Sequence, residues 1–236
     1  MSSKSKNLQK FGGASALYSA GALLTAIIFF LIIVDYPSIT SQLEKIELIS
    51  KYELYFTSMY IISYVIFGFA LVIISYAIHE KLKRTESSLA KVATTFGIIW
   101  AALLIGSGMV FNSGIKVAVE LYITNPVQAV SVFSAVEAVS LGLGFAYGEI
   151  IGGLWILTIS LICLKNNVFQ KGLNYLGLAI GVIGIISIIP ILNDLAGLFG
   201  VLLIIWFIWL GVLLIRGNKA HGSSQVRSNK SSNGIS

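Results

Sequence analysis

Glu149 is the one charged residue within the long apolar stretches of this chain of 236 residues. It precedes Lys165 by 16 residues, so in a continuous helix the two would lie about 24 Å apart. If Lys165 marks one face of a bilayer, Glu149 lies in the third of the bilayer nearest the opposite face. A carboxylate in an apolar environment is unfavourable unless it is paired, hydrated or protonated, and such residues usually serve a function. Glu149 is therefore the first candidate for a ligand-binding or proton-transferring residue.

Several polar side chains could surround Glu149. Asn112, Lys116 and Glu120 follow one another at intervals of four residues, which puts them on one face of a helix. The chain leading to Glu149 could complete the group with two further residues, Glu137 and Tyr147. This set predicts an outward-facing pocket for a small cation or polar ligand.

A purely structural role for the same residues is the alternative. Lys116 and Glu120 could pair with each other on their own helix. Glu149 would then form hydrogen bonds that determine the order of the helices.

Residues suited to metal or nucleophilic catalysis are scarce. The two histidines, His79 and His221, lie in different segments, and the single cysteine, Cys163, has no histidine near it in the sequence. The sequence motifs of serine hydrolases, zinc proteases and phosphate-binding loops are absent. We therefore predict no catalytic residue, no metal and no cofactor, although one sequence leaves enzymatic activity undecided. Cys163 is expected to be a small core residue.

The composition indicates an integral membrane protein. Hydrophobic residues make up 56% of the chain and charged residues 11%, with a mean hydropathy of +0.89. Soluble domains contain about 25% charged residues. Each of six apolar stretches approaches or exceeds the roughly 20 residues that a helix needs to cross a bilayer. We therefore predict an all-α bundle of six membrane-spanning helices, over residues 14–34, 54–78, 92–115, 138–164, 173–192 and 195–215.

The basic residues predict the orientation of this bundle. With both termini on the cytoplasmic side, 13 lysines and arginines lie in cytoplasmic segments and 3 outside, as the preference of basic residues for the cytoplasmic side requires. Residues 1–13 and 216–236 are expected to be disordered cytoplasmic tails. The basic residues are spread over all the inner segments, so we predict contact with anionic lipid headgroups rather than with nucleic acid.

Small residues indicate where helices pack closely. In the predicted fourth span, they recur every four residues, at Ser140, Gly144, Gly148 and Gly152. The fifth span has a shorter series of the same kind, Gly177 and Gly181. We expect these two series to face each other within one chain, rather than to form a homodimer.

Two connections contain further helix signals. Leu43, Ile46 and Ile49 have helical spacing within residues 35–53 and predict a short amphipathic helix on the outer surface. Asn125 followed by Pro126 is typical of a helix start. Whether residues 126–137 lie on the membrane or fold into it stays open.

Residues 148–155 (GEIIGGLW), the pair Leu164 and Lys165, and residues 173–182 (LNYLGLAIGV) resemble a prokaryotic membrane family catalogued as domain of unknown function 4386. The six-helix layout over residues 11–216 is similar too. In place of a Pro-Arg-Trp-like turn that is typical of the family, this chain has residues 169–172 (FQKG). The resemblance implies a small multi-pass protein of the prokaryotic cell membrane and implies no activity.

Three functions are compatible with the sequence. The first is a binding or transport protein whose pocket around Glu149 accepts a small cation or polar ligand. The second is a membrane scaffold or subunit that packs against a partner protein and has no ligand chemistry. The third is an intramembrane enzyme that uses Glu149 as an acid or base, for which a second catalytic group is missing.

Overall fold

The structure is a computed structural model in which residues 3–83, 87–144 and 149–216 are described, and these residues form helices and no strand. The α-helices are α1 (Ser3–Ile27), α2 (Gln42–Lys51), α3 (Glu53–Tyr60), α4 (Phe67–Leu82), α5 (Ser87–Thr124), α6 (Pro126–Leu143), α7 (Glu149–Lys165), α8 (Lys171–Ile186) and α9 (Leu195–Arg216). Two π-helical segments, η1 (Ile28–Ile33) and η3 (Ile61–Ile66), extend α1 and join α3 to α4. Two short 3₁₀ turns are η2 (Tyr36–Ser38) and η4 (Pro190–Leu192). The predicted all-α class is confirmed for these residues.

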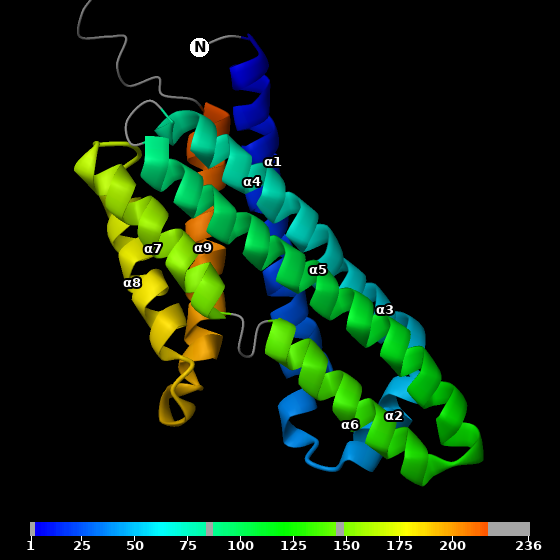
Figure 1. The fold of residues 1–236 in the computed structure, drawn as a ribbon. Coiled ribbons are helices and arrows are strands. Elements are labelled where there is room, and N and C mark those ends of the chain that lie inside the picture. The colour runs from blue at the N-terminus through cyan, green and yellow to red at the C-terminus, as the bar shows by residue number, and fades with distance from the viewer. Residues whose placement is uncertain (1–2, 84–86, 145–148, 217–236) are drawn as a thin grey trace, which may run out of the picture.

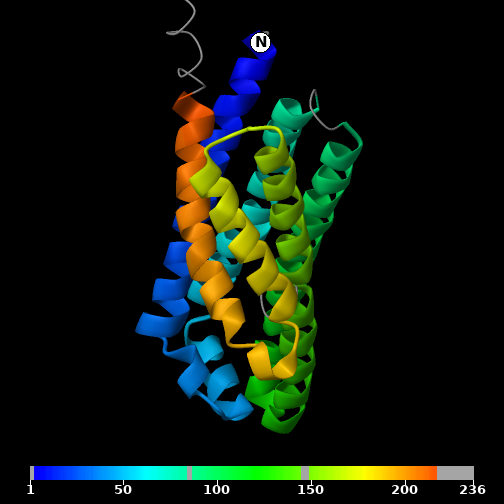
Figure 2. The same ribbon diagram turned by 90° about the vertical axis from the view of Figure 1, so that its left-hand side faces the viewer.

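Six of the helices form a closed ring (Figures 1 and 2). In ring order, α1 packs against α4, α4 against α5, α5 against α7, α7 against α8, α8 against α9, and α9 against α1. The start of α1 and the end of α9 lie at the same end of the molecule, and the turn between α8 and α9 lies lower in Figure 1. The short helix α2 packs against α5 and α6 near the opposite end.

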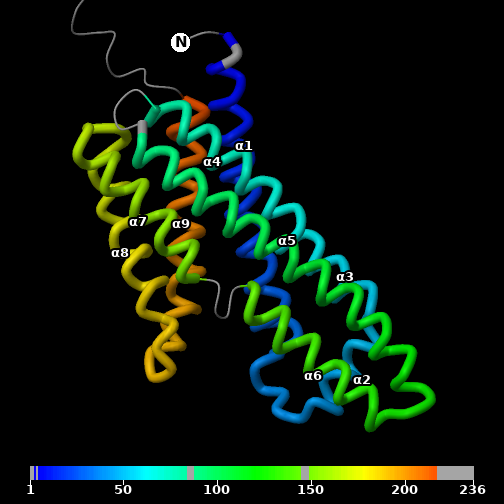
Figure 3. The backbone as a smooth tube through the Cα atoms, in the orientation of Figure 1, coloured from blue at the N-terminus to red at the C-terminus, as the bar shows by residue number. Residues whose placement is uncertain are grey.

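The predicted fourth span is interrupted. Instead of one helix over residues 138–164, α6 ends at Leu143 and α7 begins at Glu149, and the two lie one after the other along the 38 residues of α5 (Figure 3). Gly144 follows α6 with φ −96° and ψ −141°, a non-helical conformation that ends the helix. Glycine loses more backbone entropy in a helix than other residues, so it can end one. Because it is not strongly polar, it leaves the mean hydropathy of the predicted span high. The prediction of a continuous helix was therefore wrong at Gly144.

The N-terminal segment also differs from its prediction. Residues 1–13 were expected to be disordered, but α1 begins at Ser3. Gln9 donates a hydrogen bond of 2.7 Å from Nε2 to the carbonyl oxygen of Ala77 on α4, and both residues are buried. This contact gives the polar start of α1 a packing partner. Residues 217–236 of the predicted C-terminal tail lie outside the described residues.

The two helix starts predicted in the connections are confirmed. Asn125 caps α6, accepting a 3.2 Å hydrogen bond at Oδ1 from the backbone N–H of Gln128, and Pro126 is the first residue of the helix. Within 35–53, α2 begins after Ser41 and buries Ile46 and Ile49, whereas Leu43, the third predicted apolar residue, is 47% exposed. Both starts follow the preference of helix N-termini for side-chain acceptors and for proline in the first turn.

Aromatic rings fill the centre of the ring of helices. Trp155 of α7 lies between Trp100 of α5 and Trp206 of α9, with ring centroids 5.6 Å and 5.7 Å apart, and all three are fully buried. A Cβ at Gly152 would lie 2.7 Å from the Trp100 indole, so only glycine leaves room for this ring. At this contact a large ring thus packs directly against a glycine.

The two predicted small-residue series do not face each other, because Gly152 faces Trp100 of α5 and the glycines on α8 meet other residues of α7. Ser140 and Gly144 face α5, where Ser107 Oγ donates a 2.8 Å hydrogen bond to the Ser140 carbonyl oxygen. On α8, Gly181 faces α7, because its Cβ would lie 2.6 Å from Leu157 Cβ and 2.9 Å from the carbonyl oxygen of Gly153. Gly177 of α8 contacts Ser160 of α7, and Gly148 lies outside the described residues.

Five helical stretches among the described residues are long and apolar enough to cross a membrane: Ser5–Ile33, Glu53–Leu82, Ser88–Thr124, Pro126–Leu143 and Leu195–Arg216. The helices α7 and α8 have 17 and 16 residues, which corresponds to about 25 Å each. Both are slightly shorter than the ~30 Å hydrocarbon thickness.

Candidate functional site

A cavity of about 230 Å³ lies among five segments of the bundle, α1, η1, η3, α7 and α9. Its lining consists of Leu23, Ala26, Ile27, Phe30, Leu31, Ser63, Tyr64, Glu149, Ala196, Gly197, Gly200 and Val201. Nine of these twelve are apolar side chains or glycines. The polar side chains of the described lining are therefore the Glu149 carboxylate and the hydroxyls of Ser63 and Tyr64.

Glu149 is the acidic residue in the wall of this cavity. It is 2% exposed, and its Oε2 atom has no hydrogen-bond partner. Buried polar atoms in proteins almost always have a partner in protein or water, so an unpartnered carboxylate oxygen needs an explanation. Glu149 is also the first residue of α7, where free backbone N–H groups favour a negative charge.

Both π-helical segments of the described chain border the cavity. η1 contributes Phe30 and Leu31, and η3 contributes Ser63 and Tyr64. π-Helical turns are rare and occur frequently at functional sites. The hydroxyl of Tyr18 on α1 donates to the carbonyl oxygen of Ile62 at 2.8 Å and holds η3 against α1. Two irregular segments and the start of α7 thus meet at one place.

The crossing of α1 and α9 explains why space is left there. A Cβ at Gly13 would lie 2.8 Å from the carbonyl oxygen of Gly211, and one at Gly211 would lie 2.9 Å from that of Gly13. The two backbones are therefore in contact at these glycines. From this crossing the helices diverge toward the cavity, as Figures 1 and 2 show.

Two glycines of α9 widen the cavity further. A Cβ at Gly197 or Gly200 would meet nothing within 4 Å. Both residues line the cavity. Their missing side chains leave open space that larger residues would occupy.

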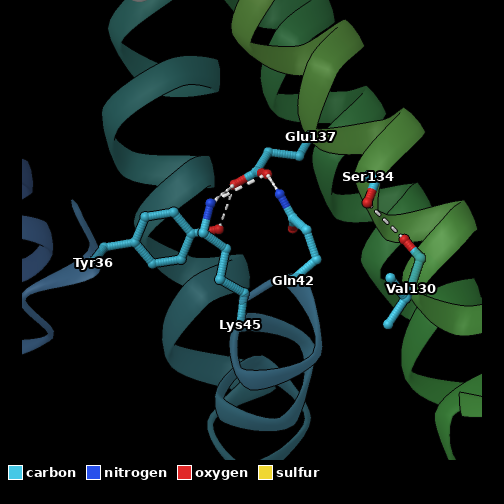
Figure 4. Close-up of polar contacts among 6 residues, drawn as sticks. All are labelled: Tyr36, Gln42, Lys45, Val130, Ser134 and Glu137. Atoms are coloured by element: carbon cyan, nitrogen blue, oxygen red, sulfur yellow. Dashed lines mark hydrogen bonds and ion pairs between the residues drawn. The ribbon is translucent and has the colours of Figure 1, made fainter. Parts of the chain in front are cut away.

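Glu137, a predicted neighbour of Glu149, lies in a different cluster (Figure 4). Its carboxylate accepts hydrogen bonds from the Tyr36 hydroxyl at 2.7 Å and Gln42 Nε2 at 2.9 Å, and Lys45 Nζ lies 3.1 Å from Oε1. Burial raises the pKa of Tyr36, and the Glu137 carboxylate raises it further, so the hydroxyl keeps the proton that it donates. Glu137 already has its partners and does not line the cavity.

The three predicted residues of α5 are also away from the cavity. Asn112 donates from Nδ2 to the carbonyl oxygen of Thr57 at 3.3 Å and ties α5 to α3. Lys116 and Glu120 are exposed, and no ion pair joins them in the described structure. Tyr147 lies outside the described residues. Of the predicted candidates that the structure describes, Glu149 alone lines the cavity.

The sequence reasoning missed the other residues of this site. Tyr64 and Ser63 lie within an apolar stretch and are the polar signal that could have been noticed. The remaining lining residues are apolar or glycine and resemble ordinary residues of a membrane helix. Their shared location follows from helix packing, which one sequence does not specify.

Among the described residues, the chemistry available at the cavity is that of one carboxylate and two hydroxyls in otherwise apolar surroundings. No group of three or more histidine, cysteine or acidic residues that could hold a metal occurs among the described residues. The described lining includes no histidine, cysteine or lysine that could act with Glu149 as a second catalytic group. The arrangement is suited to binding a cation or a hydrogen-bond donor.

No family model, no curated protein and no solved structure matches this chain. The resemblance to the family of domain of unknown function 4386 therefore stays a prediction.

Proposed function

We propose that the chain is a multi-pass protein of the prokaryotic cell membrane, with six spans and both termini in the cytoplasm. The closed ring of α1, α4, α5, α7, α8 and α9 supports six spans. Four of its members, α1, α4, α5 and α9, lie in stretches long and apolar enough to cross a membrane, and α3, η3 and α4 form one such stretch. The termini of the described bundle lie at one end (Figure 1), and the segments near that end are rich in lysine and arginine. Basic residues of short segments are retained on the cytoplasmic side.

The proposed activity is binding of a small cation or polar ligand at the cavity beside Glu149. The observation that carries this proposal is the buried, unpartnered Oε2 atom of Glu149 on the wall of a 230 Å³ cavity. Leaving a buried acceptor without a partner costs about 1–3 kcal/mol, and more for a charged group. A ligand that supplies a cation or a donor would remove this penalty, so it would bind the folded protein selectively.

The test is thermal unfolding of the purified protein with a panel of ions and small polar compounds, repeated with Glu149→Gln. A compound that binds only the folded state adds about 2.7 kcal/mol of stability at a concentration one hundred times its Kd. We expect at least one compound to stabilise the wild type and the response to be lost in Glu149→Gln. Glu120→Gln is the matched control, because it removes an exposed carboxylate and should keep the response.

A panel without effect, or an equal response in Glu149→Gln, would contradict ligand binding at this site. The scaffold role, in which the chain packs against a partner protein, would then be the proposal to test by co-purification.

A further inference from the structure

We infer that the ligand is an amphiphile dissolved in the membrane, with an apolar body and a single amine head, which enters the cavity sideways between η1 and α9. This inference rests on the proposed function and specifies the class of ligand at the same site.

The entrance is lined by apolar side chains. Leu31 of η1 is 52% exposed and Val201 of α9 is 47% exposed, and both line the cavity. The same outward face of α9 continues with Leu198, Ile205 and Ile208. On α1 and η1, the exposed apolar residues include Leu24, Ile28 and Leu31. In a protein that spans a membrane, such faces contact lipid tails, so the cavity opens toward the hydrocarbon rather than toward water.

The lining selects a cationic head. Glu149 supplies a carboxylate oxygen that lacks a donor, and the described lining contains no lysine, arginine or histidine to balance an anion. An ammonium group brings one positive charge and three N–H donors. The Ser63 hydroxyl donates to the carbonyl oxygen of Ala22 at 3.5 Å, which leaves its lone pairs available as acceptors. Phosphate or carboxylate heads would instead meet the Glu149 carboxylate.

The volume defines the size of a probe that fits entirely inside the cavity. An apolar cavity of about 150 Å³ holds one benzene molecule, which has six heavy atoms. A cavity of 230 Å³ has room for roughly nine heavy atoms on the same scale. n-Octylamine has this size, with the amine at one end of an unbranched chain. It is therefore a suitable probe.

The experiment measures the thermal unfolding of the full chain in lipid nanodiscs with four probes: n-octylamine, n-octanol, octanoate and methylamine. We expect octylamine to raise the Tm of the wild type by about 5 °C at saturating concentration. Octanol lacks the charge, octanoate has the opposite charge, and methylamine lacks the apolar body. Each should produce less than half of this shift.

Two glycine variants test the location. Gly200→Leu fills open space in the cavity wall, so it should abolish the octylamine shift. Gly21→Leu is the matched control, because its Cβ also meets nothing within 4 Å and the residue is exposed and outside the lining. Gly21→Leu should keep the full shift, and Glu149→Gln should lose it. Both leucine variants remove glycine from a helix interior, so neither is expected to unfold the protein.

The possible failures are distinguishable. If methylamine or another water-soluble cation stabilises the wild type through Glu149 and octylamine does not, the binding site stands and the membrane-dissolved amphiphile is wrong. Equal shifts with octanol and octylamine, retained in Glu149→Gln, would overturn the amine head. If none of the four probes acts through Glu149, and no ion or polar compound of the panel used to test the proposed function does either, both the inference and the proposed function fail.

Discussion

Two acidic residues in this protein have opposite surroundings. Glu137 accepts hydrogen bonds from Tyr36, Gln42 and Lys45, while Glu149 has an oxygen without a donor. The donors of Glu137 come from η2 and α2, and this carboxylate thus fastens the connection after η1 to α6. Glu137 therefore serves to hold helices together, and Glu149 is left as the residue suited to a ligand.

The Lys45–Glu137 pair should contribute measurably to stability. Its side chains are 15% and 9% exposed, so each charge would be left poorly solvated without the other. We expect Lys45→Met and Glu137→Gln each to lower the free energy of unfolding by about 1–3 kcal/mol. The double variant should lose clearly less than the sum of the two single losses. Equilibrium unfolding in detergent measures all three.

Lys83→Met provides the comparison for this pair. Lys83 contacts Glu80 on the surface of α4, with 42% of its side chain exposed, and such pairs contribute little. Its unfolding free energy should stay close to that of the wild type. Additive losses in the Lys45 and Glu137 variants would show that the two side chains act independently.

At the scale of the helices, the fourth apolar stretch consists of two helices end to end. α6 starts at Pro126 after its capping residue Asn125 and stops before Gly144, and α7 starts with Glu149 next to the cavity. Helices that are interrupted within a membrane are common around the binding sites of transporters, because the interruption exposes polar helix ends. The break is therefore what brings the start of a helix, and its carboxylate, to the cavity.

The Asn125 cap of α6 should contribute to the free energy of unfolding. Asn125→Ala removes the acceptor for the Gln128 backbone N–H, and we expect a loss of about 1 kcal/mol in the free energy of unfolding. Asn125→Asp keeps an oxygen acceptor and should restore most of the stability. Equilibrium unfolding of both variants is the measurement. Equal stability of Asn125→Ala and the wild type would mean that packing alone holds the start of α6.

Some elements could be predicted from the sequence and others could not, for physical reasons. The start of α6 has a local signal, since Asn-Pro acts within one turn. The break at Gly144 has none, because glycine every fourth residue is equally typical of close helix packing. Glu149 could be identified because it is charged. The spacing of Asn112, Lys116 and Glu120 shows that they share one face of α5, but it does not show what that face contacts. The choice of helix that faces Glu149 depends on the whole bundle.

At the scale of the whole molecule, the ring of six helices makes the location of the termini testable. Asn7 lies near the start of α1, and Asp194 lies in the turn before α9, at the opposite end of that helix from Arg216. Both residues are exposed. The native Cys163 is 0% exposed, so its thiol should not react with a labelling reagent.

Cysteine labelling should report opposite sides for these two positions. On intact cells, a membrane-impermeant maleimide is expected to label Asp194→Cys and to leave Asn7→Cys unlabelled until the membrane is permeabilised. Unmodified protein with Cys163 alone is the control and should stay unlabelled in both conditions. Labelling of Asn7→Cys but not of Asp194→Cys on intact cells would reverse the proposed orientation. Labelling of both would contradict the proposed crossing of the membrane between them.

The contact between Gly13 and Gly211 has a mechanical consequence for the cavity. Ile27 and Gly197 each lie 14 residues from this contact, which is about 21 Å along either helix. At this distance from the contact, a change of about 5° in the angle between α1 and α9 moves the cavity-lining residues of the two helices by about 2 Å relative to each other. The width available to a ligand thus depends on a single angle, set at a pivot where two backbones touch without intervening side chains.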